Sequence, residues 1–139
     1  MRRFLVDTGP LVALLNPRDH HHQWARSLFA TLEPPVFTCE VVLAEACFLL
    51  RGSVKGQAAL LQLVKDGALR CEFRMFDEIV AVTALMRRFA SVPMSLADAC
   101  LVRMCELDRD TKLATLDADF RVYRRNQRHV ISTLMPTDR

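Results

Sequence analysis

The chain has 139 residues, of which 51% are hydrophobic and 25% are charged, and its formal net charge at pH 7 is +3. This length predicts one domain covering residues 1–139, and the composition excludes a disordered chain. The charge is too small to indicate nucleic-acid binding by itself, and no apolar run reaches the roughly 20 residues of a membrane span.

Short apolar runs alternate with helical patterns along the chain. Residues 4–6 form an apolar run that ends at Asp7, which is typical of a buried strand that leads into a turn. Prolines, glycines and capping residues separate the segments that follow. We expect strands at 4–6, 36–38, 69–73, 113–116 and 130–131, and helices at 9–15, 19–33, 39–50, 54–65, 77–89 and from 95 onward.

One expected strand shows a two-residue alternation. Leu69, Cys71 and Phe73 face one side, whereas Arg70 and Glu72 face the other. A strand with one polar side is typical of a position near the edge of a sheet. The alternation of strands and helices over the whole chain predicts an α/β fold with a mostly parallel sheet.

Four acidic residues occupy positions where solvated acids are unusual. Asp7 and Asp117 directly follow expected strands, and functional residues gather at the carboxyl ends of parallel strands. Glu45 and Asp98 lie in expected helices with apolar residues one turn away, so we expect both on buried faces. A buried carboxylate must be neutralised, hydrogen-bonded or paired with a cation. A shared divalent ion would satisfy all four, and all-oxygen ligands favour Mg²⁺ or Mn²⁺ over zinc.

Three of these acids have a structural alternative. Asp7 could cap the following helix, Ser95 and Asp98 match a capping box, and Asp117 could shape a turn. Glu45 lies in the middle of its expected helix, where no capping role exists. The metal hypothesis therefore depends on the four acids as a group.

The cysteines indicate the cellular compartment. There are five of them, an odd number, and the sequence has no Cys-x-x-Cys pair, which excludes zinc ribbons and thioredoxin-like motifs. The apolar run after the basic start ends at Asp7, too early for a signal peptide. We therefore predict reduced thiols and a cytoplasmic location.

Four short segments contain the candidate acids: residues 4–8 (FLVDT), 43–45 (LAE), 93–99 (PMSLADA) and 114–120 (ATLDADF). In this order and at this spacing, they resemble the PIN-domain nucleases, and most closely the VapC-type toxins of bacterial toxin–antitoxin pairs. Each segment alone is a weak signal, but the resemblance of all four covers nearly the whole chain.

The resemblance implies a three-layer α/β/α sandwich around a mostly parallel sheet, and a single PIN-like nuclease domain. It also implies cleavage of RNA at a pocket of catalytic acids that bind Mg²⁺, or Mn²⁺ in its place. Carried over residue by residue, these acids are Asp7, Glu45, Asp98 and Asp117.

Three further residues match positions beside the acids of the family. Asp119 matches the outer aspartate of the closing segment and is expected to assist metal binding. Thr8 and Thr115 match hydroxyl positions, where they would orient the ligands or contact substrate phosphate.

A basic run follows the last acidic segment. It contains Arg121, Arg124 and Arg125, with Tyr123 among them. One interpretation is a solvated tail, and the other is a substrate-binding rim that contacts RNA phosphates beside the acids. The sequence leaves both open.

Two helical segments carry more apolar surface than a small sandwich readily covers. The first contains Trp24, Leu28 and Phe29, and the second spans 60–64. Core packing accounts for them by default. The resemblance implies that part of this surface forms a homodimer and a groove for a cognate antitoxin.

Other classes of protein fit less well. A haloacid dehalogenase-type phosphatase would require a second Asp two residues after Asp7, where Gly9 stands, and a receiver domain would require paired acids after the first strand. The remaining alternative is a non-catalytic PIN-like module that binds RNA or acts as a scaffold. Metal uptake would distinguish it from a nuclease.

Overall fold

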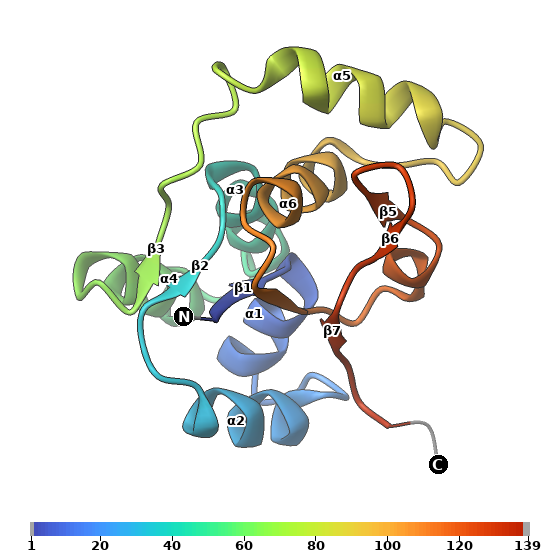
Figure 1. The fold of residues 1–139 in the computed structure, drawn as a ribbon. Coiled ribbons are helices and arrows are strands. Elements are labelled where there is room, and N and C mark those ends of the chain that lie inside the picture. The colour runs from blue at the N-terminus through green and yellow to red at the C-terminus, as the bar shows by residue number, and fades with distance from the viewer. Residues whose placement is uncertain (1, 138–139) are drawn as a thin grey trace.

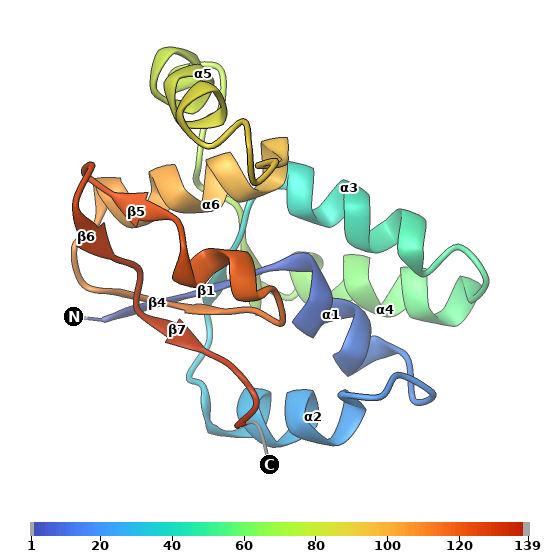
Figure 2. The ribbon, with the colours of Figure 1, turned by 90° about the vertical axis from the view of Figure 1, so that its right-hand side faces the viewer.

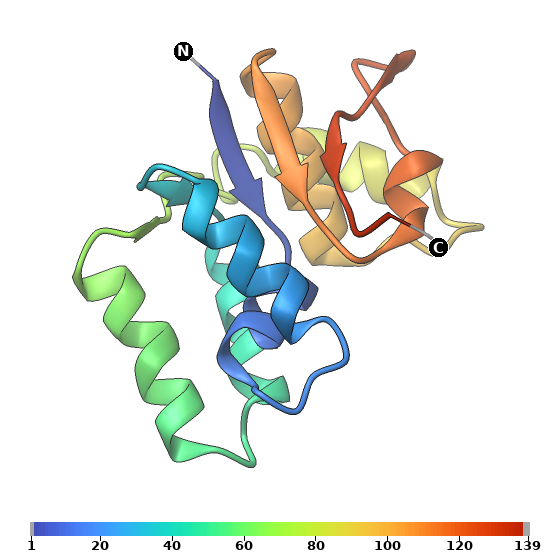
Figure 3. The same ribbon diagram turned by 90° about the horizontal axis from the view of Figure 1, so that it is seen from below.

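A computed structural model describes residues 2–137 of the chain. Its centre is a five-stranded sheet in the order β3-β2-β1-β4-β7, in which every neighbouring pair is parallel. Figure 3 shows β1, β4 and β7 side by side, with their carboxyl ends pointing the same way. The predicted parallel sheet is confirmed. Its strands are β1 (Arg3–Val6), β2 (Val36–Phe37), β3 (Leu69–Arg70), β4 (Thr111–Ala114) and β7 (Thr133–Leu134).

Helices cover both faces of the sheet. On one face, α1 (Thr8–Leu15) packs against α2 (His22–Thr31), and on the other α6 (Leu96–Leu107) carries α5 (Ile79–Arg88) on its outer side (Figures 1 and 2). This arrangement confirms the expected three-layer α/β/α sandwich.

A helical hairpin extends away from these layers. It consists of α3 (Glu40–Leu49) and α4 (Val54–Lys65), which project beyond the carboxyl ends of the strands (Figure 2). The helix α3 contacts both α1 and α6, so it joins the two helical layers at the end of the sheet where the candidate acids lie.

The two central strands bring distant parts of the chain to the same level. Leu5 pairs with Leu113 and Val6 with Ala114, and all four side chains are buried. The amide of Asp7 then donates a hydrogen bond to the carbonyl oxygen of Ala114, at 3.0 Å. The register therefore sets the residues after β1 beside those after β4.

The structure corrects two expected strands. The edge position predicted for residues 69–73 is confirmed by the sheet order, but the strand ends at Arg70. Residue 130 does not extend the main sheet, because β6 (His129–Val130) pairs antiparallel with β5 (Arg124–Arg125). Asn126 and Gln127 form the turn of this β5–β6 hairpin with φ angles of 49° and 71°. A strand of two residues is too short to show an alternating pattern, so it cannot be recognised from the sequence.

Core packing accounts for most of the apolar helix surface noted in the sequence. Leu60 is fully buried, and Leu28 and Phe29 pack half-buried against the core. Among the apolar residues of the 60–64 segment, only Leu61 is markedly exposed, at 48%. Within residues 2–137, every helix is too short or too polar to cross a lipid bilayer.

Candidate functional site

All five predicted acids line one cleft at the carboxyl ends of the central strands. The cleft has a volume of about 600 Å³, and Thr8, Leu49, Pro93 and Ser95 contribute to its walls. The acids come from the residue after β1, from α3, from the first turn of α6 and from the segment after β4. They are Asp7, Glu45, Asp98, Asp117 and Asp119.

Asp7 is the most buried of the acids. It is 7% exposed, its Oδ1 accepts the amide of Thr8 at 2.7 Å, and its Oδ2 accepts the hydroxyl of Thr115 at 2.8 Å. Burial raises the pKa of the Asp7 carboxyl to about 6, and the charges of Asp98 and Asp117 add to the rise although both hydrogen bonds oppose it. Asp7 also caps α1, so its structural alternative holds as well.

Asp98 closes the predicted capping box at the start of α6. Its amide donates to the hydroxyl of Ser95 at 3.0 Å, and its Oδ2 accepts the amide of Ser95 at 3.4 Å. The same Oδ2 accepts the hydroxyl of Tyr123 at 2.8 Å. Burial raises the pKa of the Asp98 carboxyl, against the effect of these hydrogen bonds. The capping box therefore fixes an acid of the cleft.

Glu45 is not on a buried face, and that expectation was wrong. Glu45 is exposed, and its neighbours Phe48 and Leu49 are 61% and 55% exposed, because α3 projects beyond the sheet (Figure 2). Glu45 nevertheless reaches the cleft, where its Oε2 accepts the hydroxyl of Thr8 at 3.1 Å.

Asp117 and Asp119 flank the start of a short 3₁₀ helix, η1 (Ala118–Arg121). The Oδ1 of Asp117 accepts the amide of Asp119 at 2.9 Å, and the amide of Asp117 donates to the hydroxyl of Thr115 at 3.0 Å. Asp117 thus shapes a turn, as its structural alternative predicted, and its carboxylate also borders the cleft.

The donor set of the cleft fits a hard cation. Among residues 2–137, none of the five acids forms an ion pair with a lysine, arginine or histidine. In the described chain, no three aspartate, glutamate, histidine or cysteine side chains converge closely enough to enclose an ion. Mg²⁺ keeps several of its own water molecules and needs only one or two carboxylates, so an open acidic cleft suits it.

Comparison with known proteins identifies the family. Residues 4–126, most of the chain, match the PIN domain family. The chain belongs to this family. The fold is also similar to that of VapC20 from Mycobacterium tuberculosis, a sarcin–ricin loop cleaving toxin, with a TM-score of 0.72 and 25% sequence identity over 84% of this chain and 91% of that one. No curated protein gives a significant match. The predicted resemblance to VapC-type PIN domains is confirmed.

The two threonines of this PIN domain contact acids. Thr8 donates to Glu45, and Thr115 donates to Asp7 while accepting the amide of Asp117. Thr115 is completely buried, so of its two expected uses, orienting an acid and contacting phosphate, its position favours the first.

Tyr123 is a site residue that the sequence did not reveal. It is completely buried, donates to Asp98, and packs edge-to-face against Phe89 and Phe120. Burial and the negative charge of Asp98 raise the pKa of its phenol. Its only sequence signal is that Phe120 and Tyr123 stand three residues apart, which places both on one side of a helical turn within an otherwise basic segment.

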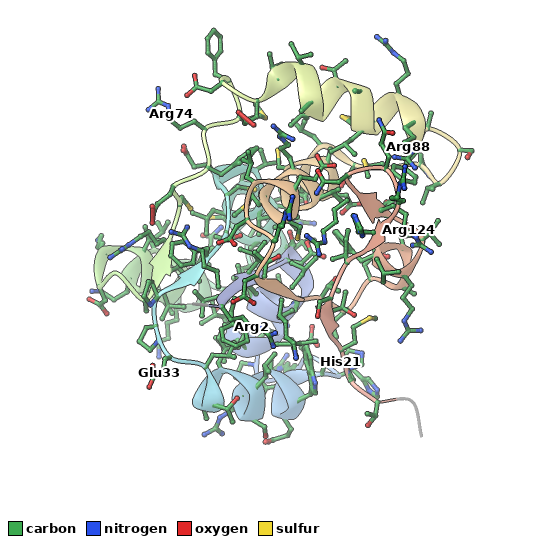
Figure 4. All side chains as sticks on the ribbon, in the orientation of Figure 1. Arg2, His21, Glu33, Arg74, Arg88 and Arg124 are labelled. Atoms are coloured by element: carbon green, nitrogen blue, oxygen red, sulfur yellow. The ribbon has the colours of Figure 1, made fainter. Side chains whose placement is uncertain are left out.

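The basic run is divided between backbone contacts and solvent. Arg124 donates through Nη1 to the carbonyl oxygens of Arg121, Val122 and Tyr123, at 2.7 to 3.0 Å, so part of its guanidinium closes η1. Arg88 donates to the carbonyl oxygen of Gln127, and both arginines lie beside the β5–β6 hairpin (Figure 4). Arg121 is exposed and Arg125 is half-buried.

Proposed function

We propose that this PIN domain is a Mg²⁺-dependent endoribonuclease and the toxin of a type II toxin–antitoxin pair. The observation that carries the proposal is the cleft in which five acids gather without a basic partner in the described chain. The similar fold of VapC20, a sarcin–ricin loop cleaving toxin, supports RNA as the substrate class.

The chemistry of the substrate explains why the acids need a cation. An RNA phosphodiester is negatively charged, so a cleft whose charged side chains are all carboxylates would repel it. Asp7, Glu45, Asp98 and Asp117, with Asp119 in support, would hold Mg²⁺, or Mn²⁺ in its place. When bound, such an ion polarises the phosphate and stabilises the charge that develops on the leaving oxygen.

The residues of the chain then act mainly by position. Thr115 and the amide of Thr8 hold both oxygens of Asp7, and the hydroxyl of Thr8 restrains Glu45. Neither histidine nor cysteine lines the described cleft, so catalysis does not depend on a Ser–His or Cys–His pair. The reaction proposed is hydrolysis, in which water attacks phosphorus and one P–O bond of the RNA chain breaks.

The proposal is tested on the wild-type chain. Purified protein should cleave RNA in the presence of Mg²⁺, lose this activity in EDTA and regain it when Mg²⁺ or Mn²⁺ is restored. Calorimetric titration with Mn²⁺ should show uptake of metal. A protein that takes up no metal and leaves RNA intact would instead be the non-catalytic RNA-binding or scaffold module.

Arg121 and Arg125 are proposed to contact RNA phosphates, whereas Arg124 is partly engaged by the backbone. Replacing both Arg121 and Arg125 by Gln should weaken binding of single-stranded RNA and lower the slope of log K against log salt by about 1.4, which is ~0.7 for each lost phosphate contact. Filter binding at several salt concentrations measures the slope. Gln substitutions at the exposed Arg26 and Lys65 are the matched control, and an equal slope in both double variants would rule out the rim.

Protein partners complete the proposal. Apolar side chains are exposed on the α3–α4 hairpin at Phe48 and Val54, just before α5 at Phe76 and in its first turn at Val80, with exposures of 61% to 86%. Exposed apolar groups of this size favour protein contacts, here a cognate antitoxin and a second copy of the chain in a homodimer. All five cysteines are free thiols, which supports a cytoplasmic location.

A further inference from the structure

We propose that Tyr123 is a positioning residue of the acidic cleft, which holds one oxygen of Asp98 so that the other faces the bound cation. This inference rests on the proposed function, since it assigns to Asp98 a role in metal binding. Tyr123 does not border the cleft itself and acts only through Asp98.

The hydrogen bonds of Asp98 are all on one side of its carboxylate. Oδ2 accepts both the Tyr123 hydroxyl, at 2.8 Å, and the Ser95 amide, at 3.4 Å. Oδ1 accepts no hydrogen bond from any described residue. Since no fully buried polar side-chain atom in residues 2–137 lacks a partner, Oδ1 must reach the solvent, and the solvent beside Asp98 is that of the cleft.

The phenol ring is fixed on all sides. Its centroid lies 5.2 Å from that of Phe89 and 5.1 Å from that of Phe120, both in edge-to-face geometry, and the side chain is completely buried. The amide of Tyr123 donates to the carbonyl oxygen of Asp119 at 3.1 Å. The hydroxyl is therefore set by the same short segment that carries Asp117 and Asp119, and it ties α6 to that segment.

The chemistry of the donor distinguishes this contact from an ordinary buried ion pair. Arginine or lysine at this position would neutralise Asp98 and compete with a cation. A neutral phenol orients the carboxylate and leaves its charge available to a metal ion. Hydrogen bonds of this kind from outside the ligand shell are worth about 10- to 100-fold in metal affinity or activity.

The experiment compares Tyr123→Phe with Thr111→Val. The first removes the hydroxyl and keeps the ring between Phe89 and Phe120, while the second removes another buried hydroxyl at the far end of β4. We expect Tyr123→Phe to weaken Mn²⁺ binding in calorimetry about 10- to 100-fold and to lower kcat with little change in KM for RNA. Thr111→Val should leave both unchanged, and circular dichroism should show both variants folded.

A second measurement reads the hydrogen bond directly. Tyr123 is the only tyrosine of the chain, so ultraviolet resonance Raman bands of tyrosine report on this residue alone. The wild type should show a phenol that donates a strong hydrogen bond. Asp98→Ala, which removes the acceptor, should shift these bands. Addition of Mn²⁺ to the wild type should shift them as well.

The outcomes separate the two proposals. Wild-type protein that takes up no metal overturns the proposed function and with it the role of Tyr123. The role of Tyr123 alone is overturned if the wild type takes up metal normally and Tyr123→Phe changes this uptake by less than twofold. It is also overturned if Asp98→Ala does not move the Raman bands of the tyrosine.

Discussion

Asp98→Asn and Asp7→Asn are each expected to lower Mg²⁺-dependent RNA cleavage by about 10²- to 10³-fold, which is the scale of losing a group that stabilises the transition state. The amide of asparagine has the shape of the carboxylate but not its charge. In Asp98→Asn the amide oxygen can still accept the Tyr123 hydroxyl, and in Asp7→Asn it can still cap α1, so both variants should fold. Cleavage of a labelled RNA under single-turnover conditions measures the loss.

The control for this prediction is the same change at an exposed acid. Asp66 ends α4, outside the cleft, and accepts a hydrogen bond from Gln62. Asp66→Asn should therefore cleave RNA at the wild-type rate. If Asp7→Asn and Asp98→Asn retain more than a tenth of that rate, the acidic cleft is not the catalytic site.

The acids that follow strands could be located from the sequence, because strand order and chain direction are enough to place them at one edge of the sheet. Asp7 ends an apolar run, Asp117 follows another, and parallel pairing of β1 with β4 places both at one edge of the sheet. Asp98 could be located for a different reason, since Ser95 and Asp98 form a local capping motif that depends on a single turn of helix.

The environment of Glu45 and the role of Tyr123 depend on tertiary packing that no local pattern contains. Apolar neighbours at helical spacing indicated a buried face for Glu45, but Phe48 and Leu49 are exposed because α3 extends past the sheet. Tyr123 and Asp98 are 25 residues apart in the sequence. Tyr123 lies between η1 and the two-residue strand β5, and the packing of this segment against α6 brings its hydroxyl to Asp98. Such contacts depend on how two distant segments pack together, and no periodic pattern in the sequence links their residues.

The metal-free protein should become more stable when Asp7 is replaced by asparagine. Folding raises the pKa of this carboxyl from 3.8 to about 6, so the folded state retains its proton more strongly than the unfolded state does. Below pH 3.8 both states are protonated and Asp7 costs nothing. As the pH rises from about 4 to 6, the unfolded state ionises first and stability falls, and above pH 6 the full cost remains, about 3 kcal/mol for two pKa units.

We therefore expect Asp7→Asn to raise the free energy of unfolding by about 1–3 kcal/mol at pH 7.5 in EDTA, and by less than about 1 kcal/mol at pH 4. Asparagine caps a helix as well as aspartate does, so the change removes the charge and keeps the cap of α1. Urea unfolding across this pH range measures the difference, with Asp66→Asn as a control that should show none.

Saturating Mg²⁺ should reduce the difference in the free energy of unfolding between Asp7→Asn and the wild type. The reason is that a ligand present at 100 times its Kd stabilises the wild type by about 2.7 kcal/mol and the variant by less. A difference that stays the same from pH 4 to 7.5 would mean that the charge of Asp7 does not destabilise the fold, and that Asp7 needs no cation to offset it.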